Sequence, residues 1–203
     1  MFILSEFKDI IRTPPNMFNQ PIEYCITQSL NQKLSNKVFP NVGLCLMLHD
    51  ITKIDDSIII PGDGASHTKV EFRYVVFRPF VSEILIGKIR SCSKEGVHVT
   101  LGFFEDILIP AEGLQQPSRF DEKEQVWVWE FDNDGDKHDL FMDPGDKLKF
   151  RVISEQFTEI SPVTCPDILD GAPSDADSPK IPYSLTGTIN ESGLGILSWW
   201  QGS

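Results

Sequence analysis

Residues that could do covalent, metal or phosphate chemistry are few in this sequence, and their spacing forms no known site. None of the histidines stands at a zinc-ligand spacing from a cysteine or a carboxylate, and no two cysteines form a C-x-x-C pair. There is no G-x-S-x-G elbow, phosphate-binding loop or G-x-G-x-x-G fingerprint. We therefore expect no catalytic residue, no metal and no cofactor, and favour a binding or assembly protein. The histidines are His49, His67, His98 and His138, and the cysteines are Cys25, Cys45, Cys92 and Cys165.

One acidic stretch, residues 130–136, imitates the start of a calcium loop. Gly135 falls at the sixth position of such a loop, but the twelfth position is Phe141, where a glutamate is required. We favour a hairpin that joins a strand at 125–131 to a strand at 138–142. Trp127 and Trp129 alternate onto one face of the first strand, where core packing is favoured over nucleobase stacking.

The charge is distributed unevenly along the chain. Eighteen basic and thirty acidic residues give a net charge of −12, whereas residues 1–80 hold eight of each sign. The excess acid therefore lies in the second half, mainly in segments 104–145 and 161–180. Such a field repels phosphates and argues against tight, independent binding of nucleic acid. Acidic inserts kept for solubility are the simpler alternative.

The environment of the protein is indicated by its cysteines and its apolar segments. Four widely spaced cysteines favour a reducing compartment. The apolar N-terminal run is too short for a secretory signal, and no window of 18 apolar residues occurs. We expect a soluble, intracellular protein with no membrane partner.

The first half of the chain predicts a small α+β domain over residues 1–80. Ile22, Ile26 and Leu30 recur at helical spacing within 21–37. Strand-like segments precede and follow this helix, which gives a β-α-β-β-β order. We expect the helix face and the apolar run 42–48 to expose surface meant for a partner. The expected strands are residues 1–7, 42–51, 58–60 and 68–80.

The second half, residues 81–203, has the spacing of an all-β domain. Five short strand-like runs with a long connection before the last fit a Greek-key OB barrel. Acidic inserts interrupt it at 111–145 and 161–180, and five prolines in 161–182 predict that the middle of this stretch is disordered. The expected barrel strands are residues 84–89, 97–101, 107–109, 147–153 and 183–189.

Residues 87–101 resemble the opening of an S1-type OB domain, and the segments before them narrow the family. Residues 41–45, 61–66 and 73–80 resemble the RNP-like first domain of the larger subunit of the RNA polymerase stalk, a family with archaeal and eukaryotic members. The segments 126–129, 161–180 and 193–200 make the chain most similar to the version in RNA polymerase III.

The resemblance implies a non-catalytic nuclear subunit. It would pair with a small helical stalk subunit, dock on the polymerase III core, and offer its OB face to nascent single-stranded RNA or to initiation factors. It would support transcription initiation at tRNA, 5S rRNA and other small RNA genes. The docking tip implied by the family is Pro61, Gly62, Asp63, Gly64, Ala65 and Ser66.

The predicted RNA contact is weak, because the S1 pattern has aromatics where residues 95–98 stand here. Affinity would then depend on the basic residues of the OB face, which are Lys88, Arg90, Lys94, His98, Lys149 and Arg151. Two alternatives stay open: a free-standing S1-type RNA-binding protein, and the stalk subunit of another nuclear RNA polymerase.

Overall fold

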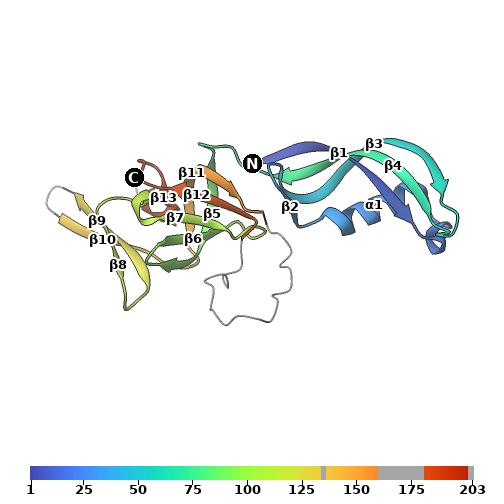
Figure 1. Ribbon diagram of the computed structural model, residues 1–203. Helices are drawn as coiled ribbons and strands as arrows, with labels where there is room; N and C mark the ends of the chain where they lie inside the picture. Colours follow the sequence, from blue (N-terminus) through green and yellow to red (C-terminus); the bar gives the residue numbers. More distant parts are fainter. Residues whose placement is uncertain (134–135, 160–180, 201–203) are drawn as a thin grey trace, which may run out of the picture. The chain divides into compact units, whose positions relative to one another are not determined.

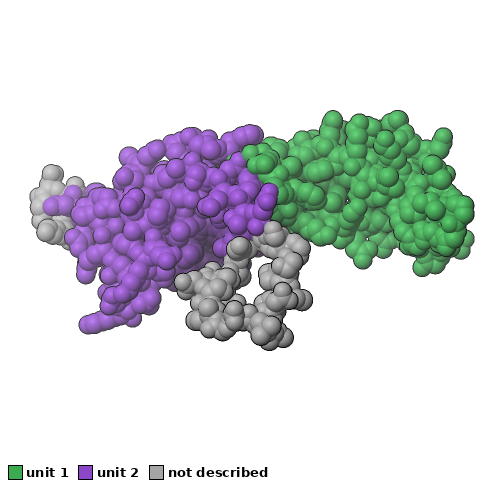
Figure 2. All heavy atoms as spheres, in the orientation of Figure 1, with its two compact units in different colours: residues 1–79 green, residues 80–203 purple. Residues whose placement is uncertain are grey.

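A computed structural model describes residues 1–133, 136–159 and 181–200 of the chain. The chain divides into two compact units, Met1–Pro79 and Phe80–Ser203, which Figure 2 colours separately. The middle of the proline-rich stretch 161–182, which is predicted to be disordered, lies outside the described residues.

The first unit is a four-stranded antiparallel sheet with one helix on one of its faces (Figure 1). The strand order is β1-β4-β3-β2. A short 3-10 helix, η1, lies between β1 and the helix. The elements are β1 (Phe2–Thr13), η1 (Pro15–Met17), α1 (Ile22–Leu34), β2 (Lys37–Phe39), β3 (Gly43–Ile59) and β4 (Ser66–Phe77).

The core of this unit lies between α1 and the sheet. Ile26 and Leu30 are fully buried and join a cluster that includes Phe72 and Tyr74 of β4. The Tyr74 hydroxyl donates to Asn31 Oδ1 at 3.1 Å, so the one polar end of that ring is satisfied. The helical spacing of the apolar residues was predicted correctly. The expectation that Ile26 and Leu30 await a partner was wrong, because their own sheet covers them.

Strand β3 differs most from the sequence-based prediction. The expected strands 42–51 and 58–60 are one strand of 17 residues, paired with β4 from Leu44 to Ile59. Four register shifts along this pairing mark bulges, where an extra residue on β3 breaks the alternation. The sequence predicted two separate strands because residues 49–57 are mostly polar, whereas the structure has one continuous strand. The short strand β2 was not predicted, because it is only three residues long.

The second unit contains a closed five-stranded barrel. Strand β12 completes it by pairing in parallel with β7 and antiparallel with β11. Val97, Ile107 and Phe150 are among the fully buried residues of the unit. The α+β class with an OB-type barrel is confirmed. The five barrel strands are β5 (Ile84–Ser93), β6 (Gly96–Thr100), β7 (Ile107–Pro110), β11 (Lys147–Phe157) and β12 (Tyr183–Thr188). The short β13 (Gly195–Ile196) pairs with β11.

A three-stranded sheet extends from this unit between β7 and β11. It consists of β8 (Ser118–Asp121), β9 (Val126–Asn133) and β10 (Asp136–Met142), with the 3-10 helix η2 (Ala111–Gly113) before it. The pairing of β9 with β10 confirms the predicted hairpin over the calcium-loop alternative.

The tryptophans of β9 are packing residues, as predicted. Trp127 is 7% exposed and donates its indole N–H to the Ser93 carbonyl at 2.8 Å. Trp129 is 9% exposed, and its ring lies 5.2 Å from that of Trp199 in the terminal 3-10 helix η3 (Leu197–Trp200). These contacts join the sheet of β8, β9 and β10 to the rest of the unit. Because both indoles are buried, neither is available to stack on a nucleobase.

The long connection between β11 and β12 is predicted to be dispensable for folding. Phe157 and Tyr183 are already paired across the two strands, and their rings stack at 4.5 Å. A deletion that joins Val163 to Lys180 keeps this pair, so we expect an unchanged Tm in a thermal melt. Deleting the β9–β10 hairpin, which removes buried tryptophans, is the destabilising control. A fall of about ten degrees in the first variant would show that the connection carries structure.

Candidate docking loop and nucleic-acid interface

The predicted docking tip is the turn between β3 and β4. Asp63 is held from two sides: Arg12 donates from Nε at 3.0 Å and from Nη2 at 2.6 Å, and His67 Nε2 lies 2.7 Å from the same carboxylate. The Asp63 backbone N–H also donates to the Ile60 carbonyl at 3.2 Å. Three segments of the unit thus hold one exposed loop in place.

These contacts alter the ionisation of Asp63. The hydrogen bonds from Arg12, and then from His67, hold the pKa of the Asp63 carboxyl well below its usual range. The carboxylate is therefore charged throughout the physiological range, and the Arg12 charge beside it is neutralised. The tip is therefore an anchored turn whose Asp63 carboxylate is paired with Arg12 and not a free charge.

The two glycines of the tip are required by backbone conformation. Gly62 has φ of +94° and Gly64 has φ of +68°, a region that other residues rarely adopt. A Cβ at Gly62 would meet nothing within 4 Å, so the restriction comes from strain and not from crowding. Ala65 is fully buried and fixes the end of the loop, and Ser66 is the first residue of β4.

Three consecutive isoleucines lead into this tip. Ile58, Ile59 and Ile60 are 66%, 60% and 48% exposed, respectively. The sequence suggested a strand there but not its exposure, which follows from the position of these residues at the far end of a bulged strand. Adjoining apolar side chains of this size on the surface are typical of an interaction site.

On the OB barrel, acidic neighbours neutralise half of the predicted RNA-binding residues. Arg90 pairs with Glu105 at 2.9 Å, Lys94 with Glu122 at 2.6 Å, and Arg151 with Glu191 at 2.7 Å. A phosphate would have to displace these carboxylates. The sequence showed many acids nearby but not which cation each would meet.

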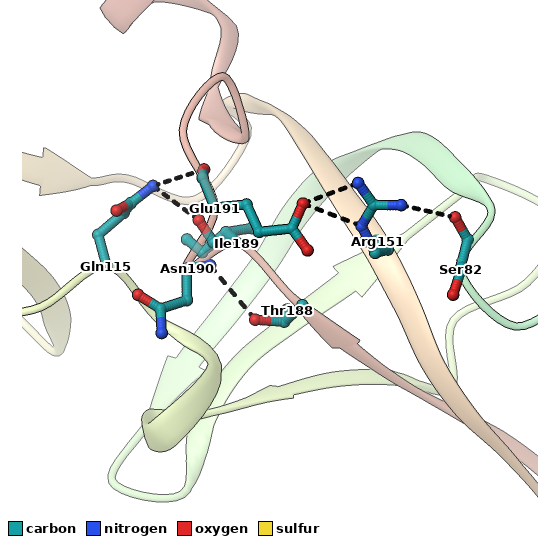
Figure 3. A network of polar contacts seen from close by, with 7 residues as sticks. All are labelled: Ser82, Gln115, Arg151, Thr188, Ile189, Asn190 and Glu191. Atoms are coloured by element: carbon teal, nitrogen blue, oxygen red, sulfur yellow. Dashed lines mark hydrogen bonds and ion pairs between the residues drawn. The ribbon is translucent and has the colours of Figure 1, made fainter.

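Arg151 belongs to a structural network, which Figure 3 shows. Its Nη1 donates to the Ser82 carbonyl at 3.1 Å, while its Nε and Nη2 donate to Glu191. Gln115 Nε2 donates to the carbonyls of Ile189 and Glu191 on the other side of the same turn. The guanidinium therefore serves to hold chain segments together.

The lysines on β5 and β11 differ from these paired cations. Lys88 and Lys147 stand directly opposite each other across the two strands, and Lys149 follows on the same face of β11. None of these three lysines forms an ion pair with any residue that the structure describes. Lys147 was missed by the sequence reasoning, although its alternation with Lys149 was the available signal.

A shallow cavity of about 420 Å³ lies beside these lysines. Its lining combines the side chains of Lys88 and Lys147 with Ile86, Thr100 and Leu197. Gly102 also lines it, and the next residue, Phe103, is 42% exposed. This aromatic residue was not predicted from the sequence, because it follows the strand that carries the S1 pattern.

His98 contributes less to this face than the lysines. It is half-buried, and its Nε2 lies 3.4 Å from Ser93 Oγ.

Within the described ranges, no three histidine, cysteine or acidic side chains cluster as metal ligands do. No described helix is long and apolar enough to span a membrane.

Comparisons with known proteins match both units. Residues 83–200 match the family model described as RNA polymerase III subunit Rpc25, and residues 8–64 match the SHS2 domain found in the N terminus of Rpb7p/Rpc25p/MJ0397.

Whole-chain relatives extend these matches. The Bos taurus DNA-directed RNA polymerase III subunit RPC8 is 57% identical over 205 residues, which cover 100% of both chains. Its Schizosaccharomyces pombe counterpart is 39% identical over 99% of this chain and 100% of its own. The Saccharolobus solfataricus DNA-directed RNA polymerase subunit Rpo7 is 29% identical over 76% of this chain and 82% of its own.

An SHS2 domain followed by an OB-type barrel defines a class of protein, the larger stalk subunits of RNA polymerases. Within this class, the chain belongs to the RNA polymerase III subunit Rpc25 family. It is a non-catalytic stalk subunit of RNA polymerase III. This assignment favours polymerase III over both alternatives, the free-standing RNA-binding protein and the stalk of another polymerase.

The anchoring of Asp63 predicts a pH dependence of the tip. Because the folded-state pKa is lowered, the contacts stabilise the tip fully above the ordinary aspartate pKa of about 3.9, and this contribution is lost as pH falls through the folded-state pKa. We expect Arg12→Gln to return the Asp63 pKa towards its ordinary value in a carboxyl NMR titration. Lys8→Gln, which breaks a pair with Glu71 in the same unit, should leave it unchanged. The same Asp63 pKa in the wild type, Arg12→Gln and Lys8→Gln would show that Arg12 does not lower the pKa of Asp63.

Proposed function

We propose that this stalk subunit docks on the polymerase III core through the tip 61–66, pairs with the small helical stalk subunit, and makes weak contact with nascent single-stranded RNA through its OB face. It acts in the nucleus, where it supports initiation at tRNA, 5S rRNA and other small RNA genes. The observation that carries the proposal is the anchored, exposed tip with its three exposed isoleucines.

Docking is supported by the rigidity of the tip. A loop that is ordered before binding loses little conformational entropy on contact. The contacts of Asp63 to Arg12 and His67 supply that order, and the isoleucines supply apolar surface to bury. Both features lie at one end of the first unit, where β3 turns into β4.

Pairing with a second subunit is supported by the face of the sheet opposite α1. Leu4 and Met47 both stand in register with Val75, so the three form a row across β1, β4 and β3. Leu4 is 49% and Met47 is 59% exposed. An apolar row on an open sheet face suits a permanent partner.

RNA contact is supported by Lys88 and Lys147, which have no ion-pair partner in the part of the chain that the structure describes. Like charges directly opposite each other on two strands are destabilising, so a bound phosphate between Lys88 and Lys147 would relieve their repulsion. The net charge of −12 opposes the approach of RNA from solution. Contact is therefore favoured once the subunit is in the enzyme, where tethering raises the effective concentration.

The docking proposal predicts a selective loss of the core. Gly62→Val combined with Gly64→Val strains the tip by about 1–3 kcal/mol per residue, since both glycines have positive φ. We expect recovery of the small partner to persist and recovery of the core to fall in a tagged pull-down that quantifies both. Gly145→Val, which is also open and has positive φ but lies in the second unit, is the control. Core retained at wild-type stoichiometry through a high-salt wash would exclude the tip as the docking point.

The RNA proposal predicts different effects of two matched charge reversals. Lys88→Glu removes a cation that has no ion-pair partner among the described residues, whereas Lys94→Glu removes one already neutralised by Glu122. Fluorescence anisotropy with single-stranded RNA should show weak, salt-dependent binding that Lys88→Glu weakens more than Lys94→Glu does. The slope of the logarithm of the binding constant against the logarithm of the salt concentration should become shallower by about one for Lys88→Glu, the change expected for one lost phosphate contact. Nanomolar affinity that salt hardly changes, or equal losses in the two variants, would contradict the assignment.

A further inference from the structure

A pocket of about 280 Å³ opens at the same end of the first unit as the tip. Its base is a row of three residues paired across the sheet, in which Ser66 stands between Thr13 of β1 and Ile59 of β3. The segment from η1 to the start of α1 supplies the rest of the wall, including Phe18 and Ile22. The pocket is therefore formed by the start of α1, η1 and the ends of three strands.

The chemistry of the lining selects the class of ligand. All eight lining residues are uncharged, and most are apolar. Phosphates, nucleotides and metal ions need charged or strongly polar partners, so this pocket does not suit them. Its volume lies just below the range of small-molecule sites and suits one or two apolar side chains.

Thr13 gives a second and independent indication of a ligand. It is only 6% exposed, and its hydroxyl is one of two buried side-chain oxygens without a hydrogen-bond partner among the described residues. Buried polar groups are nearly always paired in native proteins, so an unpaired hydroxyl beside a pocket marks a missing partner. A backbone amide or carbonyl of an entering peptide would satisfy it after a rotation about χ1.

The surface around the pocket indicates a macromolecule. Phe18 and Ile22 on the wall are 46% and 43% exposed, and Ile59 is 60% exposed. This apolar surface extends beyond the volume of the pocket and continues into the tip through Ser66, which belongs to both. A peptide could insert one side chain into the pocket and cover the apolar surface around it with its neighbouring residues.

We propose that this pocket receives a bulky apolar side chain from a peptide segment of the polymerase core, with the Thr13 hydroxyl hydrogen-bonded to the backbone of that segment. The inference rests on the proposed docking of the tip and specifies where the core would hold it. The tip loop then positions the unit, and the pocket supplies the anchor residue that dominates the affinity.

Neighbouring isoleucines provide a matched test. Ile59 lines the pocket, whereas Ile58 is similarly exposed and does not line it. With the full chain bound to its small partner, we expect Ile59→Asp to weaken binding to stalk-depleted polymerase core by about tenfold or more. Ile58→Asp removes only part of the surrounding apolar surface, so its loss should be smaller by about threefold or more. Equal losses would indicate a flat apolar contact and overturn the pocket.

Thr13→Val tests the hydroxyl separately. Because this substitution removes an unpaired buried hydroxyl, Tm of the subunit should stay the same or rise. Binding to the core should nevertheless weaken by about fivefold, the loss expected for one hydrogen bond. A Tm that falls, or core affinity equal to wild type, would overturn the role of Thr13.

The results distinguish this inference from the docking proposal. If the Gly62 and Gly64 variant loses the core while Ile59→Asp keeps it, the tip docks and the pocket is not used. If both variants keep the core, docking by the tip is itself wrong. Self-association of the wild-type complex in sedimentation, abolished by Ile59→Asp with core binding intact, would show that a second copy occupies the pocket and would also overturn the inference.

Discussion

Burial of alternate side chains along the barrel strands is the constraint on which the candidate RNA-binding face depends. On β5, Leu85 and Ile89 face the barrel interior, so Ile86, Lys88 and Arg90 must face outward. Gly87 also faces inward, and a Cβ there would come within 2.5 Å of Val99 Cγ1, so the position has no room for a side chain. The inner face stabilises the barrel, and the outer face is thereby left for function.

Acidic side chains then select which outward cations remain available. Arg90, Lys94 and Arg151 each have a carboxylate partner, whereas Lys88 and Lys147 stand opposite each other without one among the described residues. A net charge of −12 is thus compatible with a small basic site, since local pairing, and not total charge, decides what a phosphate meets. Such a site is suited to RNA delivered by the enzyme rather than captured from solution.

The first unit combines order and apolar exposure at a single end. The Arg12–Asp63–His67 contacts hold the turn, while Ile59 and the pocket beside it leave apolar surface uncovered. At the opposite face of the same sheet, Leu4 and Met47 expose a separate apolar row. One small domain therefore exposes two separate apolar surfaces, which fits the proposed docking on the core and the proposed pairing with a smaller subunit.

Elements whose signals lie in neighbouring residues could be predicted from the amino-acid sequence alone. The helical spacing of Ile26 and Leu30, the hairpin after Trp129 and the outward lysines of the barrel follow from periodicity, which neighbouring residues carry. Other features depend on contacts between distant residues and could not be predicted from the sequence. Strand β3 continues through its polar residues 49–57, and Glu191 neutralises Arg151. Thr13, Ser66 and Ile59 come together as one pocket base. Contacts such as that of Arg151 with Glu191 join residues 40 positions apart in the chain, and the strand register that brings distant residues together is set by packing of the whole unit.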